Sequence, residues 1–200
     1  MCELSVRTKF KVRWKCERRN GVSEAEYSLC KNCCLTLGSL KAGSLFTCPD
    51  ACRRHIRACL GKFRERGIRF AEMNEFGGKR LFYVYNAAMT EALLRDAETA
   101  EFLESRGYDC ASLHSAVAEL RARIRRGGEF PHEIGVFLGY ALDDVKAFIA
   151  DPAGGELIAG YWKVYSDVPA KKKLFGAYRS YCENVFGKLV SGQPLLTLFQ

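Results

Sequence analysis

Residues 129–165 read EFPHEIGVFLGYALDDVKAFIADPAGGELIAGYWKVY, and they are the most informative stretch of the chain. Pro131 favours the first turn of a helix, and Gly139 then interrupts the helical pattern. The pattern resumes as far as Ala150, a pair of glycines at 154 and 155 indicates a loop, and residues 157–165 alternate as a β-strand does. The stretch therefore predicts two short helices, a loop and a strand.

The first part of this stretch, residues 132–150, has the spacing of a DNA-binding helix-turn-helix. Gly135 would be the small residue where the two helices cross, and Gly139 would lie in the turn. The second helix, however, would present Asp143 and Asp144, whose carboxylates repel phosphates and more ordinarily stabilise a helix N-terminus. We therefore interpret the segment as a packed helical hairpin of the core, and its charge disfavours nucleic acid as a partner.

Outward from this stretch, helical and extended patterns follow one another irregularly. Apolar residues at helical spacing predict helices over residues 51–66, 88–95, 97–106, 112–126 and 167–189. Strands are predicted over residues 68–73 and 80–86, on either side of a turn at Phe76-Gly77-Gly78-Lys79. Because strands are few and do not alternate strictly with helices, the predicted fold class is α+β, helix-rich, with a small sheet of three or four strands.

The N-terminal residues differ from the rest in pattern and charge. Apolar residues from Val6 to Cys16 alternate with basic ones, which predicts a half-buried strand with one basic face. We therefore expect a basic N-terminal extension over residues 1–25 and a single α+β domain over residues 26–200. A second basic run lies between residues 53 and 69. Such clusters can attract nucleic-acid phosphates, but a solvated face is the preferred interpretation.

Composition narrows the class of protein. With 48% hydrophobic and 27% charged residues, the 200-residue chain is long and apolar enough for one well-buried core. Its apolar runs are too short for membrane insertion, and its N-terminus lacks the apolar region of a secretory signal. We therefore expect a cytoplasmic protein, whose ten cysteines are thiols or metal ligands rather than a disulfide framework.

The chain resembles a bacterial family of similar length that has no assigned function. The resemblance is carried by FPHEIGVFLGY at residues 130–140, DVKAFI at 144–149 and GYWKVY at 160–165, and it runs from Cys33 to the C-terminus. It also includes CLTLGSLKAGSLF, LFYVY and KKKLFGAYRSYCENV. The family pattern has proline where this chain has Ala141, which again suggests a tight break between two helices. The resemblance implies a kind of protein but names no reaction.

The strand predicted at the end of the opening stretch offers a candidate ligand site. Tyr161, Lys163 and Tyr165 would share one of its faces, where a lysine between two aromatic rings suits an anionic or planar ligand. Lys41 is a second cation for the same pocket. The alternative is a structural strand whose rings pack while the lysine covers them. The candidate ligand-binding residues are Lys41, His132, Glu133, Tyr161, Lys163 and Tyr165.

The cysteines suggest two further chemistries. Two closely spaced pairs could supply four thiolates to zinc or an iron–sulfur cluster, with ordinary thiols as the alternative. These candidate metal ligands are Cys30, Cys33, Cys48 and Cys52. Cys33 could also be a catalytic nucleophile, with His132 as its base and Glu133 beside it. Adjacent residues on a helix point about 100° apart, so Glu133 is poorly placed to orient His132, and helix initiation is the alternative role.

These observations favour a non-catalytic binding or accessory protein for a small anionic or planar ligand, or for a protein partner. The sequence specifies no cofactor. One alternative is a thiol- or metal-dependent enzyme that uses Cys33 and His132. The other is nucleic-acid binding through the two basic clusters.

Overall fold

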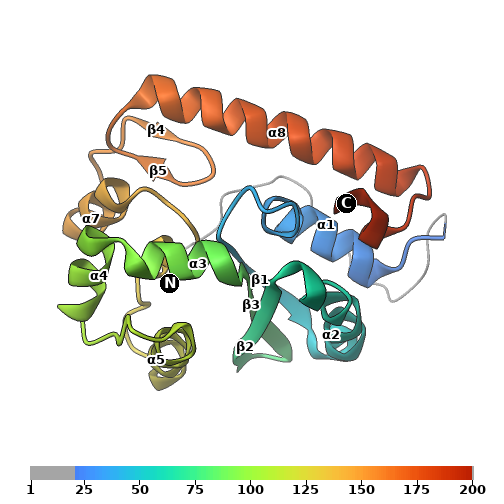
Figure 1. The fold of residues 1–200 in the computed structure, drawn as a ribbon, viewed down its shortest axis with the longest axis horizontal. Helices are drawn as coiled ribbons and strands as arrows, with labels where there is room; N and C mark the ends of the chain where they lie inside the picture. The colour runs from blue at the N-terminus through green and yellow to red at the C-terminus, as the bar shows by residue number, and fades with distance from the viewer. Residues whose placement is uncertain (1–20, 200) are drawn as a thin grey trace.

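A computed structural model describes residues 21–199 of the chain, so the strand predicted over residues 6–16 lies outside the described residues (Figure 1). The fold is helix-rich α+β, as predicted. The elements are α1 (Glu24–Leu37), β1 (Gly43–Pro49), η1 (Asp50–Cys52), α2 (Arg53–Gly61), η2 (Arg64–Arg66), β2 (Ile68–Phe76), β3 (Lys79–Asn86), α3 (Ala87–Arg95), α4 (Ala97–Glu104), α5 (Leu113–Arg126), α6 (Ile134–Phe137), α7 (Leu142–Ala150), β4 (Ile158–Ala159), β5 (Lys163–Val164), α8 (Val168–Val190) and η3 (Leu195–Phe199).

The main sheet is antiparallel, in the order β1-β3-β2, with β3 in the centre. The hairpin predicted around residues 76–79 is confirmed, although β2 extends to Phe76. Gly77 and Gly78 have φ angles of 52° and 73°, which residues with a side chain adopt only at a cost. The sequence identifies this hairpin because its turn requires glycine.

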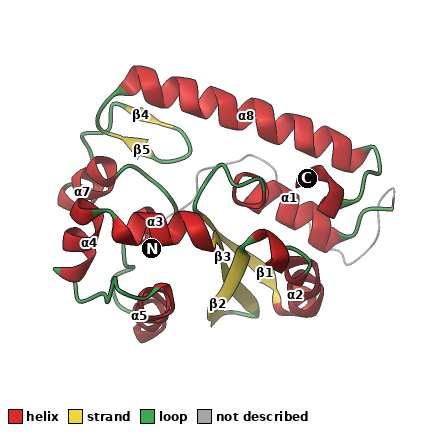
Figure 2. Ribbon diagram, viewed as in Figure 1, coloured by secondary structure: helices red, strands yellow, loops and turns green. Residues whose placement is uncertain are grey.

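Both faces of the sheet are covered by helices, which produces three layers (Figure 2). Along β3, Phe82 and Val84 point into a core cluster formed with α1, α2 and the end of α8. Leu81 and Tyr83 point into a second cluster, formed with helices α3 to α7. Each fully buried side chain of this size contributes about 1.5–3 kcal/mol, so burial on both faces makes β3 the centre of the fold.

Helix α1 and strand β1 were not predicted from the sequence. Ser23 caps α1, and Glu26 completes a reciprocal capping box with it, so the predicted division between residues 25 and 26 falls inside the first turn. Helix α1 packs against β1 and β3 and also against α8. Because it is covered from more than one side, its apolar residues form no single stripe, and the helical periodicity is weak.

The predicted helical hairpin is confirmed as α6 and α7. A side chain on Gly135 would place its Cβ 2.7 Å from a methyl group of Val145, so glycine permits the close approach of the two helices. Gly139, in the turn between them, has a φ of 76° and lies against Ala42. The break between the two helices that the sequence pattern indicated is thus made possible by the conformational freedom of glycine.

The prediction of a single strand over residues 157–165 is wrong. The segment forms a short antiparallel hairpin in which Ile158 pairs with Val164 and Ala159 with Lys163. The chain turns between them at Gly160, where a Cβ atom would collide with the ring of Phe175. This hairpin lies beside α8 in Figure 1. Within residues 21–199, no helix, α8 included, combines the length and apolar character needed to cross a membrane.

Candidate functional site

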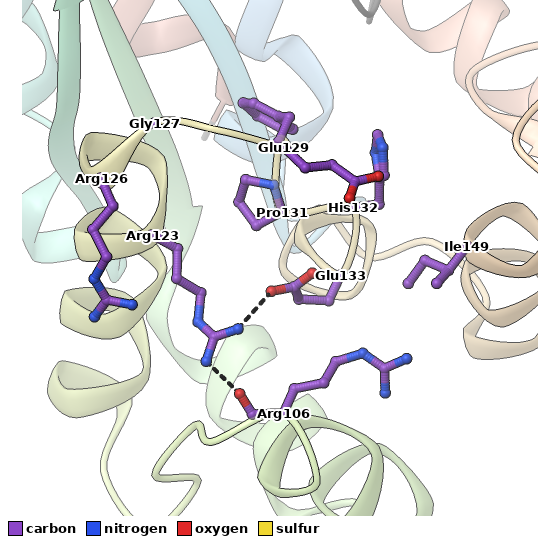
Figure 3. Close-up of a pocket in the computed structure, with 10 residues that line it drawn as sticks. Arg106, Arg123, Arg126, Gly127, Glu129, Pro131, His132, Glu133 and Ile149 are labelled. Carbon is purple, nitrogen blue, oxygen red and sulfur yellow. Dashed lines mark hydrogen bonds and ion pairs between the residues drawn. The ribbon is translucent and has the colours of Figure 1, made fainter.

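A pocket of about 340 Å³ opens where α5 ends, next to α6 and α7 (Figure 3). Basic groups and carboxylates both line it, and apolar contacts from Phe130, Pro131 and Ile149 form part of its wall. Its size falls within the range of small-molecule sites. The charged and polar lining residues are Arg106, Arg123, Arg126, Glu129, His132 and Glu133.

Glu133 is buried in the wall of this pocket, and only 7% of its surface is exposed. Its Oε1 accepts a hydrogen bond of 2.8 Å from the Tyr108 hydroxyl and one of 3.3 Å from Arg123 Nη1. Arg123 also donates to Glu119 and to the backbone carbonyl of Arg106. Burial, and then the charge of Glu133, raise the pKa of Tyr108, so the tyrosine stays a hydrogen-bond donor.

His132 occupies a different environment from Glu133, although the two are neighbours in sequence. Its ring meets that of Phe148 edge-on, with ring centres 5.0 Å apart, and lies 6.4 Å from Phe130. In Figure 3 the ring stands next to the Glu129 carboxylate, while Glu133 points the other way, toward Arg123. The two residues therefore line the same pocket in separate roles, with Glu133 bound in the wall.

Among the arginines that line this pocket, Arg106 has the fewest contacts that neutralise its charge. Its guanidinium carbon lies 3.9 Å from the centre of the Phe102 ring, and Nη1 donates to the Phe102 carbonyl at 3.2 Å. None of the ion pairs formed among residues 21–199 includes Arg106, whereas Arg123 and Arg126 both contact Glu119. Figure 3 shows its side chain extending past Glu133 below Ile149.

Lys41 lies elsewhere, between α1 and β1, and is only 9% exposed. Its Nζ is 4.9 Å from the centre of the Tyr140 ring, and the thiols of Cys33 and Cys182 lie near enough to influence its pKa. Burial lowers the pKa of Lys41 to about 8, against the opposing influence of these thiols. Lysines with a pKa lowered in this way are common at functional sites, so Lys41 remains a candidate.

The three candidate residues of the 160–165 segment do not gather around one pocket. Tyr161 packs against Phe175 and Tyr178, with ring centres 5.4 and 5.3 Å away. Lys163 forms a 3.2 Å ion pair with Glu156 and donates to the carbonyl of residue 152. The Tyr165 hydroxyl is buried without a hydrogen-bond partner. These contacts fit the structural alternative better than a ligand cage.

Asp144, which the sequence placed near a helix N-terminus, has a second role that was missed. It lies in the first turn of α7, and only 1% of its surface is exposed. Its carboxylate accepts 2.8 Å hydrogen bonds from Trp162 Nε1 and from the backbone amide of Tyr165, and Lys171 Nζ lies 3.7 Å away. Asp144 therefore ties the β4–β5 hairpin and α8 to α7.

The four candidate metal ligands, which include the proposed nucleophile Cys33, are all buried in the core cluster around α1. Within residues 21–199, no three histidine, cysteine, aspartate or glutamate side chains are arranged to hold a metal ion. Burial raises the pKa of Cys33, and it raises that of Cys48 to about 11. Cys33 also lies on the opposite face of the sheet from Phe130, the neighbour of His132, so the structure does not bring Cys33 and His132 together.

The second basic run forms a hollow of about 540 Å³ at the start of α2, lined by Arg53, Arg54, His55 and Arg57. Glu72 neutralises part of it, because its carboxylate accepts from Arg53 at 2.9 Å and from Arg57 at 3.0 Å. The first basic cluster lies before residue 21, outside the described residues.

Comparison with known proteins identifies a family to which the chain is similar. The family model that matches is described as "Protein of unknown function (DUF3793)", and it matches residues 29–199. No curated protein and no solved structure matched the chain.

Proposed function

The chain belongs to the DUF3793 family of proteins of unknown function, and we propose that it binds a small anionic ligand, a carboxylate or phosphate compound, in the pocket between α5 and α6. The observation that carries this proposal is Arg106, a cation in the pocket that has no carboxylate partner among the described ion pairs. A guanidinium matches two oxygens of a carboxylate or phosphate with two parallel hydrogen bonds.

The rest of the pocket supports this role by holding its shape without a ligand. Tyr108 and Arg123 already satisfy the Glu133 carboxylate, so this buried charge does not compete for Arg106. The stacking of Arg106 on Phe102 restricts the side chain before any ligand arrives. A site that is ordered in advance loses less conformational entropy when it binds. The role of His132 would be to offer a ring nitrogen at the opposite wall.

The proposal is tested by replacing Arg106 with methionine, which keeps a stem that can pack on Phe102 but removes the charge. Citrate and inorganic phosphate are the probes, and calorimetric titration measures binding. Loss of a charge-assisted hydrogen bond costs about 1.5–3 kcal/mol, so we expect Arg106→Met to weaken binding of the better probe roughly 10- to 100-fold. Arg95→Met is the matched control, because Arg95 is exposed and its ion-pair partner among the described residues is Glu91, on its own helix. Equal affinities of the two variants would contradict the proposal.

Glu129 supplies a test in the opposite direction. It is exposed, it lines the pocket, and Figure 3 shows its carboxylate beside His132. A carboxylate at this position repels an anion, so we expect Glu129→Gln to tighten binding severalfold at low salt, with a smaller gain at high salt. The same substitution at Glu91, which lies outside the pocket, should leave the affinity unchanged. A weaker affinity of Glu129→Gln for citrate or phosphate would contradict an anion site next to Glu129.

We also propose that the protein works in a reducing, cytoplasmic compartment. All eight cysteines within residues 21–199 are free thiols, which supports this location. Cell fractionation of the native host, with an antibody against the full chain, would test it. Recovery outside the cytoplasm would contradict it.

A further inference from the structure

The pocket between α5 and α6 contains two side chains of opposite charge that the protein itself leaves unpaired. Three arginines and two glutamates line the pocket, and three of these five side chains form ion pairs, with each other or with Glu119. In the part of the chain that the structure describes, the ion pairs include neither Arg106 nor Glu129. The pocket therefore offers one cation and one anion to a ligand.

The other charged groups of the wall are already used. The Glu133 carboxylate accepts hydrogen bonds from Tyr108 and Arg123, and Arg123 also contacts Glu119 at 2.8 Å. Arg126 shares the same Glu119 carboxylate, at 3.4 Å. A ligand that used any of these groups would first have to replace an interaction within the wall. Recognition of a charged ligand therefore falls to the two unpaired side chains.

These two side chains lie at separate places along the pocket. Figure 3 shows the Glu129 carboxylate above Ile149 and the Arg106 guanidinium below it. Ile149, Phe130 and Pro131 supply the apolar part of the lining. The pocket thus presents a negative charge and a positive charge with apolar surface between them.

We propose that the pocket binds an ω-amino acid, a carboxylate compound that carries a protonated amine at the other end of a short carbon chain. This inference rests on the proposed function and names the class of ligand within it. The carboxylate accepts two parallel hydrogen bonds from Arg106, the ammonium group donates to Glu129, and the carbon chain covers Ile149. An α-amino acid matches this arrangement less well, because its two charged groups are attached to the same carbon.

This class of ligand gives a reason for the presence of Glu129 in a pocket that binds a carboxylate. A carboxylate at this position repels citrate or phosphate, but it attracts the amine of an ω-amino acid. The same side chain therefore selects against simple anions and in favour of compounds that carry both charges.

The test compares ligands of equal length that carry one charge or both. The compound δ-aminovalerate has both groups, pentanoate has only the carboxylate, and pentylamine has only the ammonium group. Calorimetric titration of the full chain at low salt and about pH 8, where all of these groups are charged, measures the three affinities. We expect δ-aminovalerate to bind about two- to fivefold more tightly than pentanoate, the usual effect of an exposed ion pair, and pentylamine to bind most weakly.

Two neighbouring chain lengths are measured in the same way, because the separation that the pocket prefers is part of the question. These pairs are γ-aminobutyrate with butyrate and ε-aminocaproate with hexanoate. The proposal requires that at least one amino acid of the series binds more tightly than its matched carboxylate.

Two substitutions then assign the two charged groups of the ligand to their partners. Arg106→Met should weaken the binding of both δ-aminovalerate and pentanoate. Glu129→Gln should weaken the binding of δ-aminovalerate but tighten that of pentanoate, each by about two- to fivefold. Glu91→Gln, which lies outside the pocket, should change neither affinity. Circular dichroism checks that each variant is folded.

The outcomes separate this inference from the proposed function on which it rests. If Glu129→Gln tightens both ligands alike, or if no amino acid of the series exceeds its matched carboxylate, the ligand class is overturned. The citrate and phosphate titrations would still decide the anion site in that case. If Arg106→Met leaves the affinities for all of these compounds unchanged, the anion site itself is overturned, and the ligand class with it.

Discussion

At the scale of single residues, Lys41 is the side chain whose burial is hardest to explain by stability alone. A buried ammonium group loses its hydration, and a neighbouring carboxylate normally compensates for that loss. Among the described residues, the partners of Lys41 are the Tyr140 ring and the nearby thiols of Cys33 and Cys182. A ring and two thiols compensate only in part, which is why the pKa falls to about 8.

The lowered pKa predicts a pH-dependent cost in folding free energy. The unfolded chain holds the Lys41 proton up to about pH 10.5, whereas the folded chain releases it near pH 8. The cost is therefore complete below pH 8, where it is on the order of 3 kcal/mol, and it disappears as the pH rises to 10.5. We expect Lys41→Met to be more stable than the wild type at pH 7, with the gain shrinking between pH 8 and 10. Urea unfolding across this range measures it.

Exposed Lys62 supplies the control for this measurement. Lys62→Met should show no such trend in its stability relative to the wild type. A gain for Lys41→Met that stays constant from pH 7 to 10 would mean that improved packing, not relief of a buried charge, stabilises the variant.

At the scale of elements, the contact between α6 and α7 depends on one missing side chain. Gly135 lies where Val145 approaches from α7, and an added methyl group would meet Val145 at 2.7 Å. Val145 belongs to a packed core cluster, so it has little room to move. We expect Gly135→Ala to lower the free energy of unfolding by about 1–3 kcal/mol, the usual cost of overpacking.

A matched substitution separates this effect from the general one of replacing glycine. Gly61 ends α2 without a positive φ, and a methyl group added there would meet nothing within 4 Å. Gly61→Ala should therefore be neutral or stabilising by up to about 1 kcal/mol, because it reduces the entropy of the unfolded chain. Guanidinium unfolding of both variants is the measurement. Similar stability changes at the two positions would show that the helix crossing tolerates a methyl group.

At the scale of the whole molecule, we propose that the described residues form one cooperative domain. The sheet contributes side chains to both large clusters, and α8 takes part in a third that contains Trp162. The chain has two tryptophans, so Trp14→Phe leaves Trp162 as the only indole reporter. We expect the urea transitions followed by Trp162 fluorescence and by far-ultraviolet circular dichroism to coincide. Two separate midpoints would instead divide the chain into independent units.

The elements that could be predicted from the sequence are those with local signals. The β2–β3 turn needs glycines with positive φ, the α6–α7 break needs Gly139, and the covered face of α5 repeats at helical spacing. Helices α3, α4 and α8 were likewise predicted close to their observed bounds, because each has a clear start or stop signal.

The remaining features depend on contacts between distant segments, so they could not be predicted from local sequence signals. Helix α1 is covered from several sides and shows no stripe, and alternation over residues 157–165 is common to a strand and to a hairpin with a short turn. The candidate site also depends on distant partners, because Glu133 meets Tyr108 and Arg123. Propensity and periodicity act over a few neighbouring residues, whereas burial and charge pairing arise where separate segments pack together.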